Sequence, residues 1–382
     1  MLAIHHANLV LETGILWDGM MLVEDGRICA IGKAGTLDVP EGTQWVDAQD
    51  AYVGPGFVDI HVHGGGAYES HIDPLHTAEF FLRYGTTTIL ATPSYDQNFL
   101  ELMEEIRRGK QAMKAGGAGK AIAGLYLEGP YMNVKYGARA FRNPWGGPVQ
   151  PAEYTALVDE AGDAARIWAI APEREGLLPF LEYARAVNPD TVFALGHSEA
   201  TPNQIRALGK YRPMLMTHCT NATGRIGESG GIRGVGPDEY CFTTPEMYAE
   251  LICDSCAIHV KPDMQRMILH CKGLEKTILI TDSNVCEAPN PPEFSHIEDL
   301  TFDEQGGLNG SKLTMDQACR NIMTHTNCGI TQAFLLASRN PARVLGLEHE
   351  IGTLEPGKKA NLVFVDHKFR VQRVMLEGNF VE

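Results

Sequence analysis

Two histidines stand two residues apart at the end of an apolar run near the start of the chain. His61 and His63 follow the run 53–58, and three consecutive glycines come directly after them. Side chains two apart on a β-strand point to the same face, so both imidazoles should project together. Two adjacent imidazoles can bind a transition metal. Such a pair is also compatible with two unrelated polar residues at a strand end, so its meaning depends on the rest of the chain.

Other side chains of metal-binding type stand at the same position relative to later apolar runs. They are Glu128 after 121–127, His197 after 191–195, His218 after 213–217 and Asp282 after 276–281. Each one alone could be a turn, loop or capping residue. A random scatter of histidines and acids would not place them at strand ends again and again. We therefore predict one metal site at which these strand ends converge.

The elements that would position these residues alternate along the chain. Continuous β-branched or Leu-rich runs are typical of strands buried on both faces, and eight occur, at 53–62, 86–92, 121–127, 166–171, 191–195, 213–217, 249–253 and 276–281. Amphipathic segments between them predict helices, among them 99–113, 151–161, 176–186 and 262–271. Eight strand–helix repeats predict an α/β fold, a closed (β/α)8 TIM barrel. A doubly wound open sheet is the alternative, but the chain lacks its GxGxxG turn.

The two ends of the chain have a different pattern, with short β-like segments and a hairpin turn signal at 24–27. Neither end can form a sizeable core alone. We therefore predict a small β-sandwich domain built from both chain termini, residues 1–50 and 347–382, beside a barrel domain of residues 51–346.

Composition limits the classes of partner and compartment. The chain has 382 residues, 44% of them hydrophobic, and a net charge of -16, which argues against nucleic acid and anionic membranes as partners. No apolar run is long enough to span a bilayer, and the first residues do not look like a signal peptide. Nine scattered cysteines suggest reduced thiols in a cytoplasmic protein, with Cys253 and Cys256 as a buried structural pair.

Eight motifs carry a resemblance to a known family and span nearly the whole chain. They are PGFVDIHVHG (55–64), LEGPY (127–131), IAPE (170–173), GHSEA (196–200), THCTNA (217–222), ITDS (280–283), NPAR (340–343) and GTLEPGKKANLV (352–363). With these motifs the chain resembles the amidohydrolase superfamily and, within it, the N-acetylglucosamine-6-phosphate deacetylase family.

The resemblance implies a ligand set and a catalytic residue. Glu128, His197 and His218 would hold the main divalent ion, and His61 and His63 would allow a second ion with Glu128 as a bridge. One or two ions per subunit, Zn or Fe(II), suit these ligands. No lysine stands where other amidohydrolases carry a carbamylated bridging lysine. Asp282 would act as the general base and then as the general acid.

The resemblance also implies substrate contacts and a partner. Asn221 and Ala222 would contact the sugar phosphate, and His259 and Arg225 would serve its phosphate end. Arg139 stands where the family has a substrate-binding histidine. Three features depart from the family pattern: this segment, the spacing before Arg225 and the spacing before His259. The sequence therefore specifies the reaction type better than it specifies the sugar. A homodimer is the implied assembly.

The function implied is hydrolysis of the acetamide of N-acetylglucosamine 6-phosphate to glucosamine 6-phosphate and acetate. One alternative is a sister amidohydrolase acting on another N-acetylated amino sugar phosphate, such as N-acetylgalactosamine 6-phosphate, or on another N-acyl or cyclic amide. A second alternative is a catalytically silent barrel that binds a ligand. The joint presence of Glu128, His197, His218 and Asp282 counts against a silent barrel.

Overall fold

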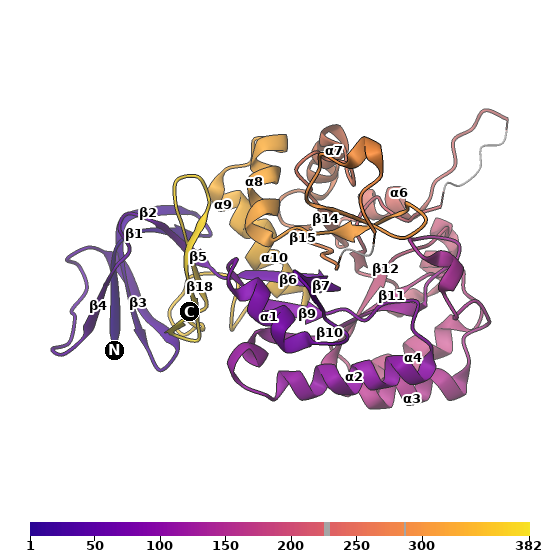
Figure 1. The fold of residues 1–382 in the computed structure, drawn as a ribbon, viewed down its shortest axis with the longest axis horizontal. Helices are drawn as coiled ribbons and strands as arrows, with labels where there is room; N and C mark the ends of the chain where they lie inside the picture. The colour runs from indigo at the N-terminus through magenta and orange to yellow at the C-terminus, as the bar shows by residue number, and fades with distance from the viewer. Residues whose placement is uncertain (225–229, 286–287) are drawn as a thin grey trace.

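The fold is a parallel barrel joined to a sheet made from both ends of the chain (Figure 1). It is seen in a computed structural model that describes residues 1–224, 230–285 and 288–382. In Figure 1 the terminal sheet lies on the left, where both termini are found, and the barrel lies to its right.

The barrel sheet contains eight parallel strands, as the alternation of apolar runs predicts. Their order is β6 (Phe57–Val62), β9 (Thr86–Ala91), β10 (Ile122–Tyr131), β11 (Ala165–Ile170), β12 (Val192–Leu195), β13 (Leu215–Met216), β14 (Tyr248–Ile252) and β15 (Thr277–Ile280). Contacts at the ends of β15 and β6 bring the first and last strands together. The amide of Asp282 donates to the carbonyl of His61 at 3.1 Å. One residue earlier in the chain, the hydroxyl of Thr281 donates to the buried carboxylate of Asp59 at 2.6 Å.

A helix follows each barrel strand. These helices are α1 (Pro74–Leu82), α2 (Phe99–Met113), α3 (Pro151–Ala161), α4 (Leu177–Val187), α5 (Pro202–Ala207), α6 (Pro237–Phe242), α7 (Pro262–Lys272) and α8 (Met315–Thr326). Helix α2 begins at a capping box in which Asn98 accepts from the amide of Glu101 and the Glu101 side chain accepts from the amide of Asn98. Helices α2, α3 and α4 pack side by side along one flank of the barrel (Figure 1). The chain then passes through α9 (Ile330–Phe334) and α10 (Asn340–Val344) on its way back to the terminal sheet.

Strands from both termini form one hydrogen-bonded sheet. Its members are β1 (Leu2–Leu11), β2 (Gly14–Glu24), β3 (Arg27–Lys33), β4 (Gln44–Asp47), β5 (Tyr52–Pro55), β18 (Leu362–Val365), β19 (Val371–Leu376) and β20 (Asn379–Phe380). The two ends meet where β5 pairs antiparallel with β18. Ile4, Met21, Val53 and Leu362 belong to the buried core that this sheet forms.

The first predicted strand, 53–62, is two strands in the structure. Residues Tyr52–Pro55 belong to the terminal sheet, and the barrel strand begins at Phe57. The chain crosses from one sheet to the other at Gly56, where a Cβ would lie only 2.2 Å from the hydroxyl oxygen of Thr87. A side chain at this crossing would therefore force the two sheets apart.

Two short hairpins complete the end of the barrel at which the strands finish. They are β7 (Gly64–Gly65) with β8 (Tyr68–Glu69), and β16 (Leu300–Phe302) with β17 (Leu308–Ser311). No helix in the described ranges is both long and apolar enough to cross a membrane. Of the predicted cysteine pair only Cys253 is buried; Cys256 is exposed because it lies in the loop after β14, and both thiols are free.

Glu105, on the buried face of α2, makes stability depend on pH. Burial raises the pKa of its carboxyl to about 8, and Arg108 counters this only in part. Between the ordinary value of 4.5 and about 8 the folded chain holds a proton that the unfolded chain has lost. The free energy of unfolding must therefore fall as pH rises through this window, by at most about 1.4 kcal/mol per pH unit.

We expect Glu105→Gln to remove that part of the pH dependence, because the amide stays neutral. Thermal melting of wild type and variant at about pH 6 and about pH 8 tests this: the stability of the variant relative to the wild type should increase from the lower pH to the higher. Glu104→Gln, on the exposed face of the same helix, is the control and should follow the wild type. Equal pH dependence of Glu105→Gln and wild type would contradict the prediction.

Candidate metal centre and active site

The predicted ligands come together at the end of the barrel where the strands finish. His61 and His63 come from the end of β6, Glu128 from β10, and His197 and His218 follow β12 and β13. All five side chains are buried. Ligand atoms of His61, His63 and Glu128 form one cluster, and those of Glu128, His197 and His218 form a second, each with all atoms within 4.8 Å of one another.

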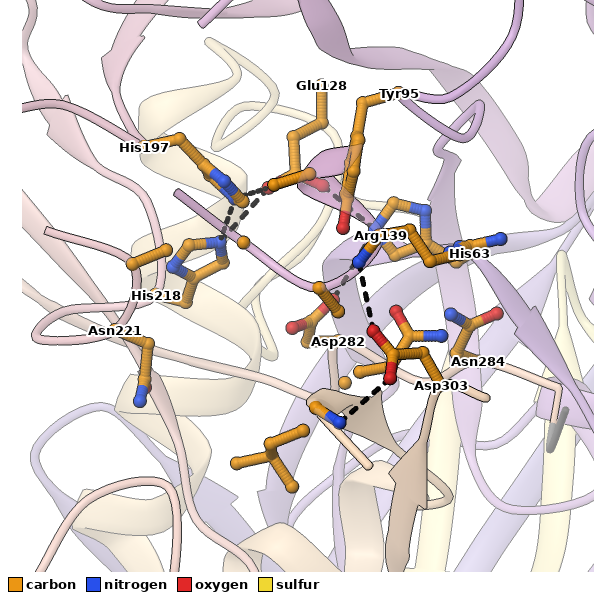
Figure 2. A pocket seen from close by; sticks show the side chains of 18 of the residues that line it. His63, Tyr95, Glu128, Arg139, His197, His218, Asn221, Asp282, Asn284 and Asp303 are labelled. Carbon is orange, nitrogen blue, oxygen red and sulfur yellow. Dashed lines mark hydrogen bonds and ion pairs between the residues drawn. The ribbon is translucent and has the colours of Figure 1, made fainter. Parts of the chain in front are cut away.

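Glu128 divides its two carboxylate oxygens between the two clusters. Its Oε1 lies 3.1 Å from Nε2 of His197 and 3.0 Å from Nε2 of His218. Its Oε2 lies 3.0 Å from Nε2 of His63 and 3.4 Å from Nε2 of His61. Figure 2 shows Glu128 with the His197–His218 pair on one side and His63 on the other. This arrangement suits a carboxylate that bridges two cation positions.

The histidine nitrogens that face Glu128 fit a metal. Nδ1 of His197 lies 3.0 Å from the carbonyl oxygen of Tyr136, and this contact is a hydrogen bond only if Nδ1 carries the proton. In the neutral ring, Nε2 of His197 then presents a lone pair, and Nε2 of His218 lies only 3.0 Å away. Nε2 of His61 is buried and makes no hydrogen bond with any described residue. A divalent cation would satisfy these nitrogens and Glu128 together.

Charge at the centre also favours an ionised Glu128. Burial works against the charged form, but the charge of His61 and hydrogen bonds to His197 and His218 outweigh it, and the pKa of Glu128 lies well below its usual value. The carboxylate therefore stays ionised across the physiological range, which a metal ligand requires.

Asp282 follows β15 and faces the same centre. Its Oδ1 lies 3.5 Å from Nε2 of His63 and 3.7 Å from Nε2 of His61. Asp282, His197 and His218 all have a left-handed backbone, with φ of +47°, +47° and +25°. Such conformations cost energy in non-glycine residues and cluster at functional sites. For Asp282, hydrogen bonds from its amide to His61 and to its carbonyl from Ser311 hold the conformation.

A pocket of about 720 Å³ opens onto the centre, a size suited to a small-molecule substrate. Its wall includes Asn221, Ala222 and His259 as well as Glu128, His63, His197, His218 and Asp282. Asn221 donates through Nδ2 to the carbonyl of His259 at 3.0 Å, and its Oδ1 has no hydrogen-bond partner among the described residues. The predicted substrate contacts Asn221, Ala222 and His259 are therefore neighbours in one wall.

Asp254 fixes the orientation of His259. Its Oδ2 accepts from Nδ1 of His259 at 3.0 Å and from the amide of His259 at 2.9 Å. Burial opposes the charge of Asp254, yet hydrogen bonding to His259 and its charge lower the pKa of this carboxyl. Nε2 of His259 is buried and unpartnered within the described ranges, so it remains available to a ligand.

The two arginines of the sequence prediction have different outcomes. Arg139 lies in the pocket wall, where its guanidinium contacts Asp96 Oδ2 at 3.3 Å and the hydroxyl of Ser94 at 3.1 Å. Its amide donates to Asp303 at 3.0 Å. Arg225 lies outside the described residues. The contact of either arginine with substrate stays a prediction.

Sequence reasoning missed several residues of the pocket, among them Tyr95, Asn284 and Asp303. Tyr95 follows β9, so the strand-end rule that found the ligands could have found it. Its hydroxyl is buried without a hydrogen-bond partner among the described residues. Asp303, from the β16–β17 hairpin, accepts from the amides of Arg139, Gln305 and Gly307 and ties two loops together over the pocket. No local sequence signal indicates that pairing.

Comparisons with known proteins agree with this geometry. A model of the amidohydrolase family matches residues 52–381. The N-acetylgalactosamine-6-phosphate deacetylase of Escherichia coli O157:H7 is 29% identical, over 97% of this chain and 97% of its own. The N-acetylglucosamine-6-phosphate deacetylase of Vibrio furnissii is also 29% identical, over 86% of this chain and 82% of its own.

Solved structures give the same result. The N-acetyl-D-glucosamine-6-phosphate deacetylase of Mycobacterium smegmatis has a TM-score of 0.81 and 28% identity, with all of both chains covered. A mutant of that enzyme, solved in complex with N-acetyl-D-glucosamine-6-phosphate, has a TM-score of 0.81 at 26% identity, over 99% of this chain and 98% of its own.

Proposed function

The chain belongs to the amidohydrolase family, and from this premise we propose that it is a metal-dependent deacetylase of N-acetylated hexosamine 6-phosphates. The substrate we propose first is N-acetylglucosamine 6-phosphate, which would give glucosamine 6-phosphate and acetate. The family resemblance drawn from the eight sequence motifs is confirmed.

The observation that carries the proposal is Glu128, placed between two histidine pairs at the floor of a pocket, with Asp282 beside it. When bound there, a divalent ion polarises the amide carbonyl and lowers the pKa of water from about 15.7 to about 7. Glu128, His197 and His218 would hold the main ion, and His61 and His63 would complete a second position. Zn and Fe(II) both suit these ligands, with one or two ions per subunit.

Asp282 supplies the proton transfers that amide hydrolysis needs. Its carboxylate would accept a proton from the attacking water as the C–O bond forms. The same proton would then pass to the amine nitrogen as the C–N bond breaks, so that the amine leaves in neutral form. Tyr95 also lines the pocket, and its buried hydroxyl, which has no partner among the described residues, would donate to the substrate.

The sugar phosphate end would be held by the part of the wall that Asn221, Ala222 and His259 form. Oδ1 of Asn221 and Nε2 of His259 are buried and have no partner among the described residues, and His259 would contact the phosphate. Ala222 would contact the sugar, Arg225 the phosphate, and Arg139 a further polar group of the substrate. We also propose a cytoplasmic homodimer, on the family resemblance and on the composition.

A specific finding favours a second candidate substrate, N-acetylgalactosamine 6-phosphate. The relative that covers 97% of both chains carries that name, and Arg139 replaces a histidine of the family pattern near the sugar. The two sugars differ only in the configuration at C4, whereas the acetamide that would be hydrolysed is at C2.

Acetate release by the metal-loaded enzyme tests the proposal. The panel contains both sugar phosphates, the corresponding sugars without phosphate, and an N-acetyl amino acid. The proposal expects turnover of a phosphorylated sugar and at least about tenfold lower kcat/KM without the phosphate. Turnover of the unphosphorylated compounds alone, or none at all with metal bound, would overturn it.

We expect His259→Asn to raise KM about 10- to 100-fold with a smaller effect on kcat, because it removes a contact to the phosphate end rather than to the amide. Steady-state kinetics with the best phosphorylated sugar, and with the same sugar lacking phosphate, measures this. The loss should be confined to the phosphorylated substrate. His296→Asn, an exposed histidine, is the control. A fall in kcat alone would assign His259 to another step.

A further inference from the structure

Glu250 is a charged residue at the centre of the barrel that has no part in the mechanism above. It lies in the middle of β14, where its neighbour across the sheet is Ile278 of β15. Its side chain is completely buried, with 0% exposure. A carboxylate in such a place is stable only if other groups hold it through hydrogen bonds or charge.

One oxygen of Glu250 holds two parts of the metal centre. Its Oε2 accepts from Nδ1 of His61 at 3.1 Å and from the backbone amide of His218 at 3.1 Å. The contact with Nδ1 orients the ring of His61, which comes from β6. The contact with the backbone amide supports the left-handed conformation of His218, which follows β13. Glu250 itself is not among the residues that line the pocket.

The contact with His61 decides which nitrogen faces the centre. A hydrogen bond from Nδ1 to a carboxylate requires the proton on Nδ1, so Nε2 of the neutral ring presents its lone pair. That atom lies 3.4 Å from Oε2 of Glu128. The ring of Tyr126, 4.4 Å from that of His61 between centroids, limits its rotation from one face.

The two histidine pairs, His61 with His63 and His197 with His218, differ in the group that holds Nδ1 of one member. Nδ1 of His197 faces the backbone carbonyl of Tyr136, whereas Nδ1 of His61 faces the side-chain carboxyl group of Glu250. The two clusters share the single carboxylate of Glu128, so a second divalent ion would add positive charge to a site that already holds one. A buried carboxylate behind His61 offsets that repulsion and makes His61 a stronger donor.

We propose that Glu250 is a positioning residue that makes His61, His63 and Glu128 a functional second metal position. Without it, the main ion at Glu128, His197 and His218 would bind as before and the second would bind more weakly. The inference rests on the proposed metal centre but not on the identity of the sugar.

Zinc binding to the metal-free protein tests this without any substrate. Zinc is titrated against a competing chromophoric chelator, and zinc content is measured after gel filtration. The wild type should bind two ions per chain. Glu250→Gln keeps the shape and removes the charge, so it should bind the first ion as the wild type does and the second roughly 10- to 100-fold more weakly.

Further variants separate positioning from a structural role. Glu246→Gln, an exposed residue just before β14, should behave as the wild type. His61→Asn removes the second ion directly, and adding Glu250→Gln to it should cause no further loss. Should Glu250→Gln fail to fold, Glu250→Asp keeps the charge but withdraws it from His61, and it should still weaken the second ion alone.

Three results would overturn the inference. The first is a single zinc site in the wild type, and the second is unchanged affinity for both ions in Glu250→Gln. The third is equal weakening of both ions in Glu250→Gln together with a lower melting temperature of this variant without metal. A wild type that binds no zinc or Fe(II) would instead overturn the proposed function. Binding of two ions with no acetate release from any substrate would leave this inference standing and remove only the deacetylase proposal.

Discussion

Asp282→Asn should lower kcat by about two to four orders of magnitude while leaving metal content unchanged. The amide of asparagine has nearly the shape of the carboxylate but cannot accept the proton from water or return it to the amine. Its backbone contacts, the amide to His61 and the carbonyl from Ser311, do not involve the side chain and should survive. Metal content, KM and kcat, measured on the same preparation, separate the loss of proton transfer from a loss of ligands.

The matched control for this variant is Asp263→Asn. Asp263 lies in the first turn of α7 with its side chain fully exposed, and it pairs with Arg266 one turn further along the helix. This substitution removes the same charge far from the pocket and should leave kcat as in the wild type. Near-normal turnover of Asp282→Asn with full metal content would exclude Asp282 as the general base.

The sequence predicts that the candidate ligand side chains converge, because local rules fix their positions. Period-two alternation places His61 and His63 on one face of β6, and barrel closure brings the ends of strands far apart in the chain to one rim. His197, His218 and Asp282 each follow a strand and Glu128 lies in the last part of β10, so the same two rules place them. None of these steps requires knowledge of a particular side-chain contact.

Residues that hold the candidate ligands in place are harder to predict from the sequence. Glu250 lies inside the apolar run 249–253, and a lone acid within a buried strand is a signal that could have been noticed. Which group it would hold was not predictable, because its partner His61 is 189 positions away. The contact of Asp303 with the amide of Arg139 spans 164 positions and depends on how two loops fold over the pocket. Loop conformation of this kind follows from tertiary packing, for which the chain has no periodic pattern.

The break in the first predicted strand has a similar cause. The run 53–62 is largely apolar because both of its halves are buried, one in the terminal sheet and one in the barrel. Hydropathy cannot distinguish one long buried strand from two short ones in different sheets. Gly56 was the local signal, since a glycine within a strand often marks a close backbone approach.

Glu128→Gln should remove metal from both positions and lower kcat/KM by about three orders of magnitude or more. Glutamine has one oxygen where Glu128 uses two, and its NH₂ group would face ring nitrogens that must act as donors to a metal. It also removes the only carboxylate that the two described ligand clusters share, so both pairs of histidines lose the carboxylate that lies between them. Zinc content after gel filtration, with acetate release on the same sample, measures both effects.

The comparison among three variants then tests the whole arrangement. Glu182→Gln, on the exposed face of α4, is the control for Glu128→Gln and should keep full metal and full activity. Asp282→Asn should keep metal and lose turnover, Glu250→Gln should bind one ion more weakly, and Glu128→Gln should lose both. A Glu128→Gln protein that retains two ions would mean that Glu128 does not bridge, and the division of its two oxygens between the histidine pairs would then have no role in metal binding.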